Sequence, residues 1–203
     1  MPIYCVFMLR NESLGLVGSI RTVYGLTDLK RQGWLDRGVP EHLCESVAGH
    51  SYRTSQAGFH YTRDSRMVRM LVVHDWGEGI VGDITPHDNV DPNEKRRLET
   101  DAMRRIVSPL PFGNQIMSLW LEYEDAKTPR AKTAKQLDKL DAAVMALVYE
   151  QMGFEVSEFY PYSRNKLTDS ALVQVFDTLL ERNHNLQDSH RVYFNLLAEA
   201  RRH

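Results

Sequence analysis

Side chains suited to binding a metal ion lie far apart in this sequence, and their spacing constrains the fold more than any other feature. They are His50, the neighbours His74 and Asp75, and Asp138. The His-Asp pair follows an apolar run, residues 71–73, which places an imidazole beside a carboxylate where water is partly excluded. Two imidazoles and two carboxylates can bind one divalent cation and leave positions open for water and substrate. A fold that uses all four must bring distant segments together.

The pattern of apolar residues predicts helices almost throughout the chain. No stretch of useful length shows the strict alternation of a half-buried strand. Residues 86–93 predict a turn-rich loop, and residues 153–167 an irregular but packed segment. We therefore expect an all-α fold, a compact helical bundle. The expected helices span residues 46–61, 65–76, 93–107, 112–125, 131–152, 168–181 and 189–201.

Length and composition indicate an ordinary globular protein. With 203 residues, we expect a single domain over residues 1–203, with its motifs at about 15–152 and C-terminal helices within 168–202. The net charge of -2 argues against nucleic-acid binding. No stretch approaches the ~20 apolar residues of a membrane span.

The cysteines and the N-terminus favour a cytoplasmic protein. Cys5 and Cys44 form no CxxC pair, which suits plain thiols in a reducing compartment. Residues 1–9 are apolar but lack the charge and cleavage site of a secretory signal. For residues 8–31, which are rich in basic side chains, two interpretations stay open: the first helix of the fold or an organelle-targeting segment.

Asp138 and Asp141 lie on an otherwise apolar stripe of the helix expected at 131–152. Buried carboxylates are costly unless they are paired, protonated or bound to metal. The simple alternative is a hydrogen bond between helices. We take Asp138 as a metal ligand and Asp141 as a residue that orients a ligand by a hydrogen bond. His50 has small neighbours that leave room for close approach.

Glu78 and Asp83 follow the His-Asp pair. If the helix at 65–76 continues for one more turn, Glu78 faces the same site and can orient a metal-bound water or move its proton. The alternative is a surface acid. Asp83 lies in a turn marked by Gly82. It can bind a second cation, bind the sugar of a substrate, or cap the turn.

Arg31 and Trp34 suggest a place for a phosphorylated ring compound. An exposed Trp34 suits a flat ring or sugar, and an arginine matches the oxygens of a phosphate. The alternative places Trp34 in the core of an amphipathic turn. Arg53, one turn after His50, is a second phosphate candidate.

The order of the four metal-type residues resembles the HD phosphohydrolase superfamily. A closer resemblance, to the HD-domain 5'-deoxynucleotidases, rests on five blocks in a fixed order. They are residues 31–39, 45–53, 73–86, 119–125 and 135–141. The resemblance covers about residues 15–152 and implies the helical bundle of the HD-domain type. It implies hydrolysis of deoxyribonucleoside 5'-monophosphates, and family members are commonly homodimers.

The resemblance also implies site residues. A divalent cation (Mn²⁺, Co²⁺ or Mg²⁺) is expected on His50, His74, Asp75 and Asp138. In some relatives the positions of Glu78, Asp83 and the Ile84 carbonyl hold a second cation. The family's adjacent Arg-Trp pair corresponds to Arg31 and Trp34, separated here by two residues, so Arg31 and Arg37 both stay candidates for the phosphate or sugar. The partner expected is a small-molecule nucleotide.

Other functions stay open at this point. The same metal site can act on a nucleoside triphosphate, a cyclic nucleotide or an alarmone. A helical module that binds nucleotide without turnover is a third hypothesis. Spacing does not select the metal, because mixed sites of His and carboxylate accept several first-row ions.

Overall fold

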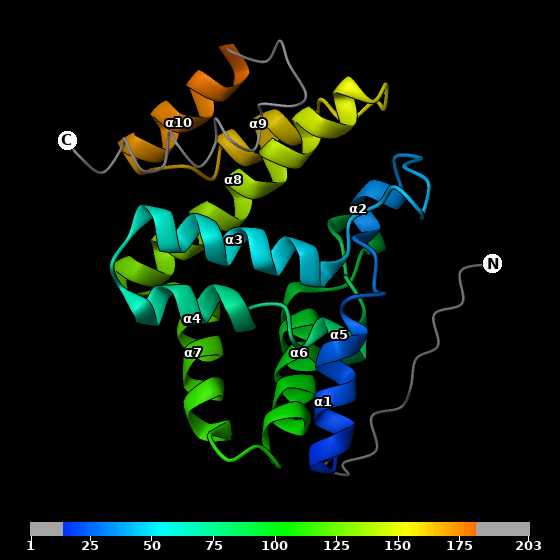
Figure 1. The fold of residues 1–203 in the computed structure, drawn as a ribbon, viewed down its shortest axis with the longest axis vertical. Coiled ribbons are helices and arrows are strands. Elements are labelled where there is room, and N and C mark those ends of the chain that lie inside the picture. Colours follow the sequence, from blue (N-terminus) through cyan, green and yellow to red (C-terminus); the bar gives the residue numbers. More distant parts are fainter. Residues whose placement is uncertain (1–13, 182–203) are drawn as a thin grey trace.

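The fold is built around one long central helix. In the computed structural model, which describes residues 14–181, α8 (Pro129–Gln151) packs against α3 (Val47–Tyr61), α4 (Ser65–Val73) and α7 (Gly113–Asp125). Helices α9 (Phe159–Arg164) and α10 (Ser170–Glu181) also pack against α8 (Figure 1). Helix α6 (Pro92–Val107) packs beside α7 and also contacts α1 (Leu16–Gly25) and the short α5 (Glu78–Val81).

The remaining elements are short. They are α2 (Gln32–Leu35) and a 3₁₀ turn, η1 (Pro86–Asp88). Within residues 14–181 the structure has no strand, only an isolated bridge between Lys30 and Ser46. The all-α prediction is therefore confirmed. The helix expected at 189–201 lies outside the described residues, and the single-domain interpretation stays a prediction.

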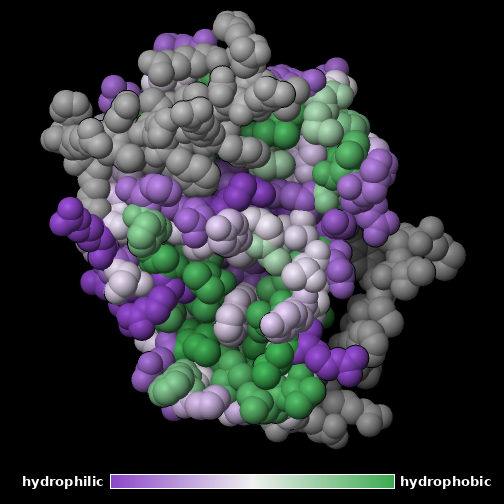
Figure 2. All heavy atoms as spheres, viewed as in Figure 1, coloured by the Kyte–Doolittle hydropathy of each residue, from purple (hydrophilic) through white to green (hydrophobic). Residues whose placement is uncertain are grey.

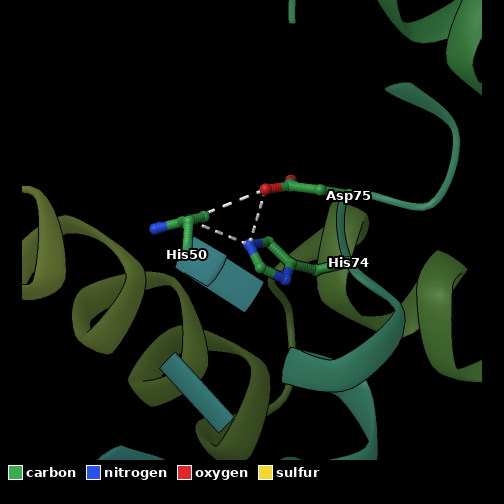
Figure 3. A group of neighbouring side chains, drawn as sticks. All are labelled: His50, His74 and Asp75. Carbon is green, nitrogen blue, oxygen red and sulfur yellow. Dashed lines mark hydrogen bonds and ion pairs between the residues drawn. The ribbon is translucent and has the colours of Figure 1, made fainter. Parts of the chain in front are cut away.

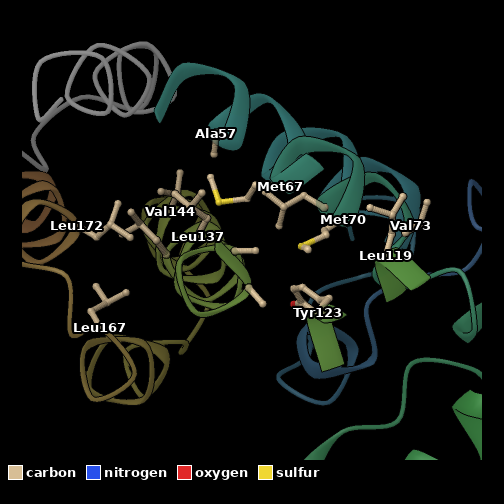
Figure 4. Packing of buried hydrophobic residues seen from close by; sticks show 14 of the residues in the cluster. Ala57, Met67, Met70, Val73, Leu119, Tyr123, Leu137, Val144, Leu167 and Leu172 are labelled. Atoms are coloured by element: carbon tan, nitrogen blue, oxygen red, sulfur yellow. The ribbon is translucent and has the colours of Figure 1, made fainter. Parts of the chain in front are cut away.

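The core fills the space between α8 and its neighbours. Apolar side chains of α4, α7, α8 and α10 meet there, among them Met70, Tyr123, Leu137 and Leu172 (Figure 4). A smaller cluster joins Trp34 to Tyr149 on the other side of α8. Because α8 is buried on two faces, it is apolar over much of its surface. Its buried residues also include the carboxylates of Asp138 and Asp141.

Helix ends follow local capping. The side chain of Ser46 accepts from the Gly49 N–H at the start of α3, and Asp64 accepts from the first turn of α4. Thr128 caps α8, which begins at Pro129, two residues earlier than the expected helix at 131–152. These caps fix where the helices that carry the site begin.

Two further features differ from expectation. Helix α4 ends at Val73, not at residue 76, because the backbone bonds tighten there to the i→i−3 pattern, with the Trp76 N–H donating to the Val73 carbonyl (3.2 Å). In the turn that follows, the indole N–H of Trp120 donates to the His74 carbonyl (3.1 Å). Residues 153–167, expected to be irregular, contain α9. Pro161 fits there because it lies in the first turn, where backbone N–H groups have no partner within the helix.

Within the described residues, no helix combines the length and apolar character needed to cross a membrane.

Candidate metal centre

His50, His74 and Asp75 converge from two helices. His50 is on α3, while His74 caps α4 and Asp75 follows it (Figure 3). The Nε2 atoms of the two histidines are 3.3 Å apart, and Asp75 Oδ2 lies 3.1 Å from His74 Nε2 and 3.6 Å from His50 Nε2. Asp138, on α8, places Oδ1 3.1 Å from His50 Nε2. The structure thus gathers all four residues that the sequence singled out.

Neighbouring groups orient both rings. His74 donates from Nδ1 to the Leu71 carbonyl (2.8 Å), which fixes Nε2 as the atom that faces the cluster. His50 Nδ1 lies 2.8 Å from Asp141 Oδ2, so its Nε2 also points inward. Asp141 is fully buried and contacts the ring nitrogen of His50 that faces away from the cluster, as expected for a residue that orients a ligand.

The cluster fits a divalent cation. Burial and Arg31 would lower the pKa of His50, but its hydrogen bonds to Asp138 and Asp141 outweigh them and raise it to about 9. Without a cation, a proton therefore supplies positive charge at this place. Buried Asp75 Oδ2 has no hydrogen-bond partner. A buried set of imidazole and carboxylate atoms that attracts positive charge is the donor set of a first-row divalent ion.

Glu78 faces the same site although α4 does not continue. It begins α5, and its buried Oε2 lies 3.7 Å from Arg31 Nη1 without a hydrogen bond. Burial, together with the carboxylates of Asp75 and Asp83, raises the pKa of Glu78 well above its usual value. A carboxylate at this place can orient a water molecule at the centre and exchange a proton with it.

Arg31 is held at the carboxylates of the site. Its Nη1 lies 3.3 Å from Asp83 Oδ1, 3.5 Å from Asp75 Oδ2 and 3.7 Å from Glu78 Oε2. Asp83 also accepts from the backbone N–H of Gln32 (2.7 Å), which joins the loop after α5 to α2. Arg31 is therefore placed to neutralise an anion at this centre.

The Ile84 carbonyl, expected as a ligand for a second cation, accepts a hydrogen bond from Lys95 Nζ (2.7 Å). Glu78 and Asp83 are close to Arg31. In this structure side-chain cations thus lie at the place where the resemblance implied a second metal ion. A second ion stays a prediction.

Trp34 is buried, whereas a substrate-binding role predicted an exposed ring. Only 3% of the residue is accessible, and its ring packs against Phe159 (centroids 4.1 Å apart) and Tyr149. Its indole N–H donates to Glu45 Oε1 (2.7 Å). The core alternative therefore describes Trp34 better, although one side of it still lines the cavity.

Arg53 lies behind His50 and not in the cavity. It donates to both oxygens of Asp141 (3.1 and 2.9 Å) and pairs with Glu45. It is absent from the residues that line the cavity, which argues against a phosphate contact. Arg37 is also engaged, with Nε donating to Glu158 (2.6 Å) and Nη2 lying 2.6 Å from His87 Nε2. Of the three arginines considered, Arg31 is nearest to the metal centre.

The site opens into a cavity of about 520 Å³. One wall comes from α9, with Glu158, Phe159 and Tyr162. Lys95, Lys135 and Lys139 also line it. Sequence reasoning missed all of these residues. For Lys139 a signal existed, since Lys135, Asp138, Lys139 and Ala142 follow the i, i+3, i+4, i+7 spacing of one helix face.

Comparisons with known proteins agree with this site. The family model described as HD domain matches residues 24–174. A 5'-deoxynucleotidase of Homo sapiens is 35% identical over 181 residues, 84% of this chain and 88% of that protein. A 5'-deoxynucleotidase of Mus musculus is 36% identical over 184 residues, 85% of this chain and 91% of that one.

Solved structures support the fold. A protein of Pyrococcus horikoshii superposes with a TM-score of 0.59 at 23% identity, over 91% of this chain and 99% of that one. With its helical fold, its converging histidines and carboxylates and these relatives, the chain belongs to the HD domain family.

Proposed function

We propose that this protein is a metal-dependent phosphohydrolase that removes the 5'-phosphate from deoxyribonucleoside 5'-monophosphates. The observation that carries the proposal is the convergence of His50, His74, Asp75 and Asp138 at the base of an open cavity. Curated relatives at about 35% identity over most of the chain are named 5'-deoxynucleotidases. The cavity volume suits one small nucleotide.

The four residues would hold one divalent cation. When bound, that ion supplies a Lewis acid for a phosphate oxygen and lowers the pKa of a water molecule toward neutrality, from ~15.7 in free water. Its identity, Mn²⁺, Co²⁺ or Mg²⁺, is left to experiment.

The protein groups divide the remaining work. Glu78 orients the attacking water and accepts its proton, because its buried carboxylate faces the centre beside Arg31 and its Oε2 has no hydrogen-bond partner. Arg31 neutralises charge on the phosphate. Asp83 holds Arg31 and the backbone of Gln32, so we propose that it positions Arg31. Trp34 forms a rigid part of the wall beside the sugar, where it disfavours a 2'-hydroxyl.

Phosphate release is the first experiment. Metal-stripped protein is assayed on dAMP, dGMP, dCMP, dTMP, AMP and dATP, with Mg²⁺, Mn²⁺ or Co²⁺ added back. Metal-dependent release from the deoxymonophosphates supports the proposal, and equal rates on dAMP and AMP would contradict the role of Trp34. Asp75→Asn should be inactive, while Asp101→Asn, on the exposed side of α6, should retain activity.

If metal-loaded protein releases no phosphate from any compound of the panel, the proposal is refuted. The alternative substrates are then triphosphates, cyclic nucleotides and alarmones. A protein that binds nucleotide but retains almost no metal would instead favour the non-catalytic module.

The oligomeric state, predicted to be a homodimer, and the predicted location in the cytoplasm both stay predictions. Apolar side chains gather on the lower half of the face in Figure 2, where α1, α4 and α7 lie in Figure 1. Val17, Ile20, Val72 and Leu121 on these helices are exposed. Such a face is compatible with contact between copies, and sedimentation of the purified protein tests it.

A further inference from the structure

Lys139 has a position that the proposed mechanism does not use. It follows the ligand Asp138 on α8, and its Nζ lies 3.0 Å from Asp138 Oδ2. It lines the cavity with Asp138 and Ala142, and 29% of its side chain is accessible. The ammonium group therefore lies beside the metal centre and on the side open to a ligand.

Asp138 does not depend on Lys139 for a hydrogen bond. Its Oδ2 also accepts from the buried hydroxyl of Tyr123 (3.0 Å), while Oδ1 faces His50 Nε2. A cation on the ligand cluster would share the negative charge of Asp138 and weaken its attraction for the ammonium group. An ammonium has three N–H donors, so Lys139 can contact a second anion.

The other lysines of the cavity are engaged elsewhere. Lys95 donates to the Ile84 carbonyl (2.7 Å), and Lys135 pairs with Glu124 (2.6 Å). Neither has a recorded contact with the four expected ligands, whereas Lys139 touches one of them. Arg31 lies at Asp75, Glu78 and Asp83. Arg31 and Lys139 thus supply positive charge at different carboxylates of the same centre.

A phosphate monoester brings close to two negative charges into this acidic site. Arg31 already faces three carboxylates, which balance much of its charge, so Lys139 would add positive charge for the phosphate beside the metal ion. We propose that Lys139 binds the phosphate group of the substrate, and of the phosphate product, beside the metal ion. The inference rests on the proposed function for the identity of the substrate.

Lys139→Met tests the proposal, because it keeps the length of the side chain and removes the charge. The measurements are KM and kcat for dAMP, the inhibition constant of inorganic phosphate, and that of deoxyadenosine, which lacks the phosphate. We expect KM and the phosphate constant to rise about tenfold to a hundredfold, the range for losing a hydrogen bond to a charged group. Metal content and the deoxyadenosine constant should stay unchanged.

Companion variants separate binding from structure. Lys139→Arg should keep most of the phosphate affinity, and Lys132→Met, an exposed lysine of the same helix, should match the unmodified protein. If Lys139→Met loses metal, or weakens phosphate and deoxyadenosine equally, Lys139 is a structural partner of Asp138 and the proposal is wrong. Phosphate affinity equal to that of Lys132→Met overturns it as well.

Calorimetry with inorganic phosphate keeps this test separate from turnover. Metal-loaded protein that binds phosphate through Lys139 but does not hydrolyse dAMP would refute the proposed function alone. Hydrolysis of dAMP with no dependence of phosphate affinity on Lys139 would refute this inference alone. If Lys139→Met folds poorly, Lys139→Gln provides the same loss of charge.

Discussion

Asp141→Asn removes one negative charge from behind the metal centre with almost no change in shape. Asp141 is fully buried and accepts from His50 Nδ1 (2.8 Å) and from two nitrogens of Arg53 (3.1 and 2.9 Å). An amide offers one oxygen in place of two, so its NH₂ group must face a donor. Either His50 or Arg53 then loses an acceptor. Arg53 keeps Glu45 as a partner, which limits the damage.

The size of the effect follows from the pKa of Asp141. Burial would raise it, but Arg53 and His50 outweigh burial and lower the pKa from 3.8 to about 2. A depressed pKa means that the ionised form stabilises the fold above pH 4, and that this contribution is lost as the pH falls toward 2. The shift corresponds to about 2 kcal/mol at neutral pH. Loss of one acceptor in a buried site gives a similar figure, about 1–3 kcal/mol.

Two assays separate stability from metal binding. Urea unfolding of metal-stripped protein at pH 7 should show a loss of about 2 kcal/mol. Metal titration of the folded variant should show affinity reduced about tenfold to a hundredfold, the usual result of removing a residue that orients a ligand. Asp101→Asn is the matched control. Its pairs with Arg97 and Arg104 are on the surface, so it should cost less than about 1 kcal/mol.

One result would refute this reasoning. If Asp141→Asn is destabilised as expected but binds metal as tightly as the unmodified protein, Asp141 supports the fold without orienting His50. A pH profile gives a second check, since the stability difference between the two proteins should shrink below pH 4.

Three other changes have defined outcomes. Asp75→Asn should abolish both metal retention and phosphate release, measured by elemental analysis and colorimetry, because it removes the carboxylate beside both histidines. Burial raises the pKa of Glu99 to about 7. The folded protein therefore binds this proton more tightly than the unfolded chain, and stability falls by up to about 3 kcal/mol as the pH rises from about 4.5 to 7. Glu99→Gln should flatten that decline in metal-stripped protein, and an unchanged slope in urea unfolding would contradict the assignment. Gly79→Ala should cost about 1–3 kcal/mol and lower turnover, because its Cβ would lie 2.8 Å from the Thr22 carbonyl and push α5 from α1. Both glycine variants are measured by urea unfolding, where Gly25→Ala, whose Cβ would meet nothing within 4 Å, should be nearly neutral.

Local patterns were sufficient for most of the helices and for the four metal-type residues. Helical periodicity and capping residues are properties of short windows, so α3, α6, α7 and α8 lie close to their expected positions. The spacing of Asp138 and Asp141 predicted that both lie on one helix face, while their roles, ligand and ligand-orienting residue, stay predictions. The structure places Asp138 at the cluster and Asp141 behind His50.

Features set by tertiary contacts could not be predicted this way. The turn after α4 contacts Trp120, which lies far along the chain and donates to the His74 carbonyl. The part of α9 in the cavity wall depends on Phe159 packing against Trp34. Neither partner is visible in the sequence around the segment that it changes.

Glu45 explains why Trp34 and Arg53 do not occupy the places that their chemistry suggested. Its Oε1 accepts the indole N–H of Trp34, and its Oε2 pairs with Arg53, which in turn holds Asp141. A single carboxylate thus joins the cavity wall to the residues behind His50. An indole and a guanidinium looked available for substrate because their partner lies between them in sequence without belonging to either helical pattern. Since each donor is already matched by an acceptor, they are better suited to keep the site rigid than to bind the nucleotide.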